Sequence, residues 1–279
     1  MQSVVRLLFL LHDDERLQRN LESIPRRPSV QRVPDWAALR AALRRAPPSA
    51  VSVVDPFSGA GEEGGLAEDL RDLLREFPGS VVLAALPVTP RTPPLLRTLL
   101  EWGVSDFIDT VREDTPAALG RRLETVRSRS VEHLLRRALP HGVPSRTRAV
   151  LMVAAEVVAT GGQAPEMAAA LGISARTIPR WCERADLPPP RRLLAWLRVL
   201  LAADLLDDPR RSIEGVARAC GYAGGPALKT ALRNLLAATP RSLRERGAFE
   251  TTAKAFAAEL FQLREGARAR GKPEQAWLH

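Results

Sequence analysis

The sequence predicts two folds in one chain, an α/β domain with a doubly wound parallel sheet and, after it, an all-α domain. The 279 residues are enough for two domains. In the first half, short aliphatic runs alternate with helical patterns, which is typical of a parallel sheet covered by helices on both faces. After a joint rich in Pro and Gly at residues 140–144, only helical periodicity follows.

Four aliphatic runs in the first half have the composition of buried parallel strands: residues 4–11, 50–54, 80–86 and 104–108. Helical patterns separate and follow these runs, at residues 15–24, 36–45, 66–77, 94–102 and from 116 onward. Residues 29–33 are a weaker candidate, in the place where a second strand is expected. Strands spaced by helices in this way imply right-handed crossovers within one parallel sheet.

We expect four segments along the chain. They are an α/β domain (1–126), a linker helix and joint (127–144), a helical domain (145–246) and a last helix with a tail (247–279). No apolar run is long enough to span a membrane, and no cleavage site follows the apolar start, so we expect a cytoplasmic protein. Two distant cysteines, Cys182 and Cys220, offer neither a disulfide framework nor a zinc site.

The net charge of +9 is unevenly distributed. Residues 1–125 hold 16 Arg and no Lys against 18 Asp and Glu, whereas residues 126–279 hold 25 Lys and Arg against 14 Asp and Glu. The basic excess therefore lies in the helical half, as expected for a protein that binds the phosphate backbone of nucleic acid. Base composition can explain the preference for Arg over Lys, but not this division.

Residues 166–181, EMAAALGISARTIPRW, have the spacing of a helix-turn-helix unit. Ala168 is small where the two helices cross, Gly172 allows the tight turn, and Ile178 anchors the second helix. Ser174 is expected to cap that second helix and is included among the predicted DNA-binding residues. The side chains predicted to face DNA lie opposite Ile178: Arg176, Thr177 and Arg180.

A second unit follows at residues 213–234, where Ala217 and Gly221 repeat the four-residue offset. Leu228 and Leu232 are expected to anchor its second helix. The outward side chains of that helix are Lys229, Thr230 and Arg233. Between the two units, the apolar residues 191–206 predict a linker helix of about four turns, long enough to hold the units about one DNA turn apart.

This region, roughly residues 145–246, resembles the DNA-binding domain of the AraC family of transcription regulators. The linker helix carries the family's order of residues at Arg198-Val199, Ala202 and Leu205-Leu206. The second unit carries it at Ser212-Ile213, Ala217, Cys220-Gly221-Tyr222, Pro240 and Arg244. The resemblance implies that the second helix of each unit enters the major groove in successive turns, and we add Arg241 and Arg244 to the predicted DNA contacts.

Three departures from the family pattern concern the predicted reading helices. Gly224-Gly225-Pro226-Ala227 replaces the usual Asp-x-Ser-aromatic stretch, and Ala237 stands where the family prefers Gly. Pro179 lies in the first reading helix, where an interior proline costs about 3 kcal/mol. We therefore expect that helix to begin near Thr177, so that Pro179 falls in its first turn.

The first half resembles the receiver domain of two-component response regulators. Asp13 and Asp14 follow the first strand and Asp55 follows the third, as the acidic pair and the phosphorylated Asp do in that family. Such carboxylates can bind Mg²⁺ while one of them stays free to act as a nucleophile. If this site is retained, Mg²⁺ is therefore the one cofactor to expect. However, Thr110 stands where the family has Lys, and the segment after the fourth strand lacks the usual Ser or Thr. We therefore expect a receiver-like fold that no longer signals by phosphate.

Together these observations predict a bacterial transcription regulator that binds double-stranded DNA sequence-specifically. Because no nucleophile–base pair, metal-ligand spacing or Gly-rich phosphate loop stands out, we expect no enzyme. By analogy with such regulators we expect a homodimer, contact with RNA polymerase and no membrane partner. Two alternatives stay open. One is a phosphorylation-dependent two-component response regulator, and the other is a protein-interaction module whose helix-turn-helix units no longer bind DNA.

Overall fold

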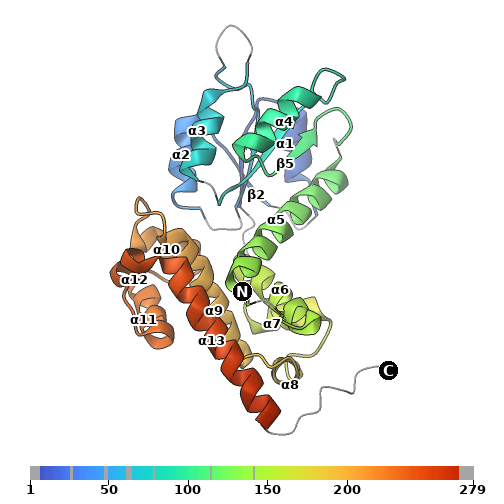
Figure 1. The fold of residues 1–279 in the computed structure, drawn as a ribbon. Helices are drawn as coiled ribbons and strands as arrows, with labels where there is room; N and C mark the ends of the chain where they lie inside the picture. The colour runs from blue at the N-terminus through green and yellow to red at the C-terminus, as the bar shows by residue number, and fades with distance from the viewer. Residues whose placement is uncertain are drawn as a thin grey trace. The chain divides into compact units, whose positions relative to one another are not determined.

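The structure, a computed structural model, describes residues 7–25, 28–46, 50–60, 65–77, 79–113, 115–140 and 142–269. The chain divides into two compact units, residues 1–130 and residues 131–279. The division falls within a single helix, α5 (Pro116–Ala138) (Figure 1).

The first unit contains a five-stranded parallel sheet with the strand order β2-β1-β3-β4-β5. Its strands are β1 (Leu7–Leu11), β2 (Ser29–Arg32), β3 (Val51–Val54), β4 (Val81–Leu86) and β5 (Asp106–Asp109). This is the strand order of doubly wound folds of the flavodoxin type, which receiver domains share. The predicted fold class is therefore confirmed, and the weak candidate strand is β2. Residues 4–6 of the first aliphatic run lie outside the described residues.

Helices cover both faces of this sheet because alternate residues of each strand point to opposite sides. In β1, Leu8 and Leu10 pack with residues of α1 (Glu15–Glu22) and α5. Phe9 and Leu11 pack instead on the other face. That face is covered by α2 (Trp36–Leu43), α3 (Glu68–Glu76) and α4 (Pro93–Trp102). The two faces thus form two separate hydrophobic clusters.

The second unit is built only of helices, as predicted, in the residues that the structure describes. After the end of α5 come α6 (Ser145–Ala159), α7 (Ala164–Leu171), α8 (Ile178–Arg184), α9 (Pro190–Leu206), α10 (Ile213–Ala219), α11 (Gly225–Leu236), α12 (Pro240–Arg246) and α13 (Ala248–Ala269). Helix α9 contacts every other helix from α6 to α13. Its apolar side chains are buried on all sides, which explains why the linker sequence is hydrophobic all round.

Helix α13 runs antiparallel along α9 and is held at both ends of that helix (Figure 1). At one end, the Asp207 carboxylate accepts hydrogen bonds from the N–H groups of Ala248 (2.6 Å) and Phe249 (3.2 Å), which begin α13. At the other end, Glu259 receives two hydrogen bonds from the Arg192 guanidinium, at 2.6 and 2.7 Å. The last helix is therefore part of the helical core, whereas the sequence placed it in a segment of its own; the domain boundaries themselves stay predictions.

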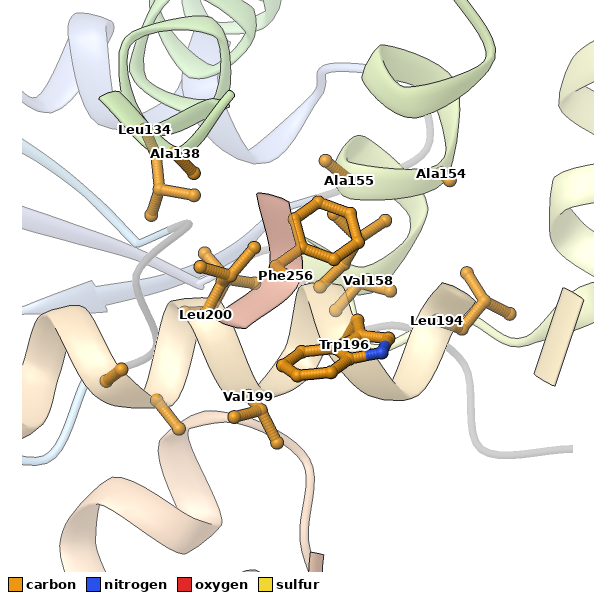
Figure 2. Close-up of a cluster of buried hydrophobic side chains, with 14 of the residues drawn as sticks. Leu134, Ala138, Ala154, Ala155, Val158, Leu194, Trp196, Val199, Leu200 and Phe256 are labelled. Carbon is orange, nitrogen blue, oxygen red and sulfur yellow. The ribbon is translucent and has the colours of Figure 1, made fainter. Parts of the chain in front are cut away.

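The core between α9 and α13 centres on Trp196, which is 2% exposed (Figure 2). Its ring lies 5.6 Å from that of Phe256, and its indole N–H donates to Glu259 at 2.8 Å. The last turns of α5 join the same cluster through four residues: Val131, Leu134, Leu135 and Ala138. One helix thus contributes side chains to the cores of both units.

We predict that Trp196→Ala lowers the free energy of unfolding of the helical unit by about 3–5 kcal/mol, because it leaves a large cavity in this core. Trp196→Phe is the matched control. It keeps a buried ring and loses mainly the hydrogen bond to the charged Glu259, so we expect a smaller loss of about 1.5–3 kcal/mol. Urea unfolding of the full chain, followed by far-ultraviolet circular dichroism, measures both. Equal losses in the two variants would contradict the packing role of the indole.

Candidate nucleic-acid interface

The first helix-turn-helix unit consists of α7 and α8. Ala168 is buried where the helices approach, and Ile178 is buried at the start of α8. Gly172 ends α7 with a φ of 66°, a left-handed conformation that disfavours residues with a Cβ. The three residues that the sequence assigned to the frame of this unit therefore have the predicted surroundings.

The start of α8 corrects one prediction and agrees with another. Ser174 does not cap the helix. It lies in the preceding turn, where its hydroxyl is 2.7 Å from that of Thr177 and its carbonyl accepts the Thr177 N–H at 2.9 Å. Thr177 is the N-cap and the helix begins at Ile178, so Pro179 occupies the first turn. A proline is accommodated there because that N–H has no partner within the helix.

The start of α8 also decides where the predicted basic side chains lie. Arg176 lies in the turn before the helix, and Arg180 lies on the helix itself. Both are exposed, and neither makes a hydrogen bond or ion pair with another residue that the structure describes. These two guanidinium groups are therefore available for an external anion.

Contacts with α6 hold α8 in place. The Arg146 guanidinium lies 5.5 Å from the ring of Trp181, and the Thr147 hydroxyl donates to the Ala185 carbonyl at 2.9 Å. On its inner side, burial raises the pKa of the Cys182 thiol to about 11, so this cysteine remains a neutral apolar residue near pH 7. The short helix depends on these contacts, because seven residues do not form a stable helix alone.

The second unit consists of α10 and α11. Ser212 caps α10 by accepting the Gly215 N–H at 3.0 Å, as its place before an apolar helix suggests. Gly221, with a φ of 75°, makes the turn. Leu228 and Leu232 are fully buried and anchor α11, as predicted. Burial also raises the pKa of the Cys220 thiol to about 12, which agrees with a core position for this residue.

The unusual Gly-Gly-Pro sequence begins α11 without a capping side chain of its own. The cap comes from α10 instead, because Glu214 accepts the Gly225 N–H at 2.7 Å. Glu214 is not among the residues predicted from the sequence. A pair of glycines at the N-cap of a recognition helix is a signal that could have prompted the search for a cap elsewhere. At the other end, Ala237 ends α11 with a φ of 49°, in the left-handed region where the related family prefers Gly.

The predicted contact residues of α11 and α12 fall into two groups. Lys229 and Arg233 are exposed, with no hydrogen bond or ion pair to other described parts of the chain. Thr230 and Arg241 are exposed but partly engaged. The Thr230 hydroxyl donates to the Pro226 carbonyl at 3.0 Å, and Arg241 pairs with Glu245 at 3.1 Å.

Arg244 is a correction to the predicted set. Its Nε donates to the Leu206 carbonyl at 3.0 Å, and its Nη2 donates to the Arg211 carbonyl. Leu206 is the last residue of α9, where helical carbonyls lack partners within the helix, and Arg211 lies in the segment between α9 and α10. This guanidinium therefore ties α12 to α9, and we do not include Arg244 in the candidate interface.

The three predicted carboxylates of the α/β unit, Asp13, Asp14 and Asp55, are not brought together as a metal site in the part of the chain that the structure describes. Asp14 caps α1 by accepting the N–H groups of Arg16 and Leu17 at 2.7 and 3.1 Å. The Asp13 side chain is fully exposed, 3.7 Å from Arg32, and Asp55 accepts the Phe57 N–H at 2.9 Å. Among the described residues, no three His, Cys, Asp or Glu side chains are grouped so that they could hold a metal ion.

Comparison with known proteins supports the assignment of the helical region. Residues 167–246 match the family model described as a helix-turn-helix domain, which is of the AraC type. The match begins within α7 and ends with α12, so it includes both units and the helix between them. A solved structure of the RcsB response regulator from Salmonella typhimurium is similar at 20% sequence identity and a TM-score of 0.31, over 69% of this chain and 98% of that chain. No curated protein matches the sequence. The resemblance of this helical region to the AraC family is therefore confirmed.

Proposed function

We propose that this protein is a non-enzymatic transcription regulator that binds double-stranded DNA sequence-specifically through the two helix-turn-helix units. One observation carries the proposal. Each unit presents two basic side chains without partners among the described residues beside a buried anchor of its second helix, and both units are fixed to the same helix, α9. The four side chains are Arg176, Arg180, Lys229 and Arg233.

The dimensions of α9 support simultaneous binding by both units. Its 17 residues span about 25 Å at 1.5 Å per residue, which is of the order of the 34 Å repeat of a DNA turn. Arginine and lysine at a groove either contact guanine edges or neutralise phosphates.

The described helices include none that is long and apolar enough to cross a membrane.

We further propose that the α/β unit acts without phosphorylation. Three observations support this. Asp14 is committed to capping α1, the three predicted carboxylates do not form a metal-binding group, and Thr110 replaces the family's lysine. The expected homodimer and the contact with RNA polymerase stay predictions.

We predict that Lys229→Ala/Arg233→Ala weakens binding to a random DNA duplex and flattens its salt dependence. The slope of log K against log salt should become shallower by about 0.9 for each phosphate that the variant no longer neutralises. Arg176→Ala/Arg180→Ala should act in the same direction. The matched control is Lys254→Ala/Arg268→Ala, which removes two exposed positive charges from α13, outside both helix-turn-helix units.

Fluorescence anisotropy at several salt concentrations measures these affinities. If the unmodified protein binds duplex with no salt dependence, or not at all, the DNA-binding proposal is wrong. The alternative of a protein-interaction module then stands.

For the α/β unit, we predict no incorporation of phosphate from radiolabelled acetyl phosphate in the presence of Mg²⁺, and equal DNA affinity with and without that treatment. Asp55→Asn should behave like the unmodified protein in both measurements. Incorporation that disappears in Asp55→Asn would instead establish a phosphorylated response regulator.

A further inference from the structure

The carboxylate of Glu214 lies at the N-terminus of the recognition helix α11. Glu214 belongs to the first turn of α10, the preceding helix. Its Oε2 accepts the Gly225 N–H at 2.7 Å, and its Oε1 accepts a hydrogen bond from Arg218 Nε at 3.0 Å. The side chain is 49% exposed, so the carboxylate also faces solvent.

The sequence at the start of α11 leaves room for this carboxylate. A Cβ on Gly224 or on Gly225 would lie only 3.1 Å from a Glu214 oxygen. Two glycines therefore permit the close approach, and they provide no capping side chain of their own. The Gly225 N–H and Arg218 both lower the pKa of Glu214, so the carboxylate stays ionised at neutral pH.

This position matters for DNA binding because the N-terminal residues of a recognition helix are the ones that approach the bases. Helix N-termini also attract phosphate, through their unpaired N–H groups and the positive end of the helix dipole. In α11 an intramolecular carboxylate already occupies that end. A DNA phosphate near it would meet a fixed negative charge.

We propose that Glu214 both positions α11 and restrains its binding to DNA, by repelling backbone phosphates from the N-terminus of the helix. The second helix-turn-helix unit then attracts DNA through Lys229 and Arg233, farther along α11. Like charges placed across an interface suppress unsuitable partners, so the carboxylate lowers affinity for random sequence. This inference rests on the proposed DNA-binding function.

The two roles of Glu214 can be separated by substitution. Glu214→Gln retains an oxygen that can accept the Gly225 N–H but removes the charge. Glu214→Asp retains the charge but shortens the side chain, so the carboxylate no longer reaches the Gly225 N–H. The matched control is Glu265→Gln, which neutralises an exposed carboxylate paired with one arginine, Arg268 at 3.0 Å, on α13.

We expect Glu214→Gln to bind a random duplex about threefold more tightly than the unmodified protein, with a steeper salt dependence, because one like charge is removed from the interface. Glu265→Gln should bind as the unmodified protein does. Glu214→Asp should show no gain in affinity and a lower thermal unfolding midpoint. Anisotropy titrations at two salt concentrations and thermal melts measure these quantities.

Each result has a defined meaning. If Glu214→Gln folds but binds no more tightly than Glu265→Gln, Glu214 is only a helix cap and the inference is wrong. A Glu214→Gln variant that does not fold also overturns it, because the amide must then be unable to hold Gly225. If the unmodified protein shows no salt-dependent binding, the DNA-binding proposal itself fails, and this inference with it.

Discussion

The burial of α9 on all sides is the constraint on which the helical unit depends. Each large apolar side chain that it buries contributes about 1.5–3 kcal/mol, and neighbouring helices can obtain that energy only by packing around it. Both helix-turn-helix units are therefore positioned by one rigid element. Two arginines reinforce this arrangement. Arg198 donates from α9 to the Gly162 carbonyl just before α7, and Arg244 donates from α12 to the Leu206 carbonyl at the end of α9. These two positions belong to the sequence pattern of the related family, and in this structure their visible role is to hold the units to α9.

Carboxylates at helix N-termini are a second recurring device. Asp14 directly precedes α1 in the chain and caps it, whereas Asp207 and Glu214 cap α13 and α11 from other helices. A cap supplied from a distance orients one helix relative to another as well as satisfying its N–H groups. The same chemistry explains why the acidic residues after β1 resemble a receiver site in sequence. A carboxylate at a strand end can bind a cation, but here Asp14 is already occupied by backbone N–H groups.

The sequence predicted the secondary structure well because the determining signals are local. Aliphatic runs and helical periodicity located β1 to β5, α1 to α5, the linker helix α9, the last helix α13 and the helices of the two helix-turn-helix units, and even the weak candidate at residues 29–33 is a strand. Helices α6 and α12 were covered only by a general prediction of helical structure. The roles of the site residues were harder to predict because the groups they contact are distant in sequence. That Ser174 lies in a turn depends on where Pro179 can be accommodated, and that Arg244 points inward depends on the end of α9, 38 residues away. The role of Glu214 depends on a backbone N–H eleven residues further on. Such contacts between residues that are distant in sequence cannot be predicted from a local pattern of residue types.

The basic excess of the helical half also acquires a different meaning from the structure. Internal contacts engage Arg192, Arg211 and Arg244, so the net charge overstates the positive surface available to a polyanion.

The cations proposed to contact DNA are those beside the second helix of each helix-turn-helix unit, and the two units differ. Helix α8 has seven residues and carries a proline in its first turn, and Arg176 precedes it altogether. Helix α11 has twelve residues and carries Lys229 and Arg233 one turn apart, a spacing that places both on one face. A longer helix with two cations on one face can follow the groove over more of its length. Because a carboxylate occupies the N-terminus of α11, the proposed function implies that its DNA contact comes from the middle of the helix. The two helix-turn-helix units would then engage DNA by different parts of their second helices.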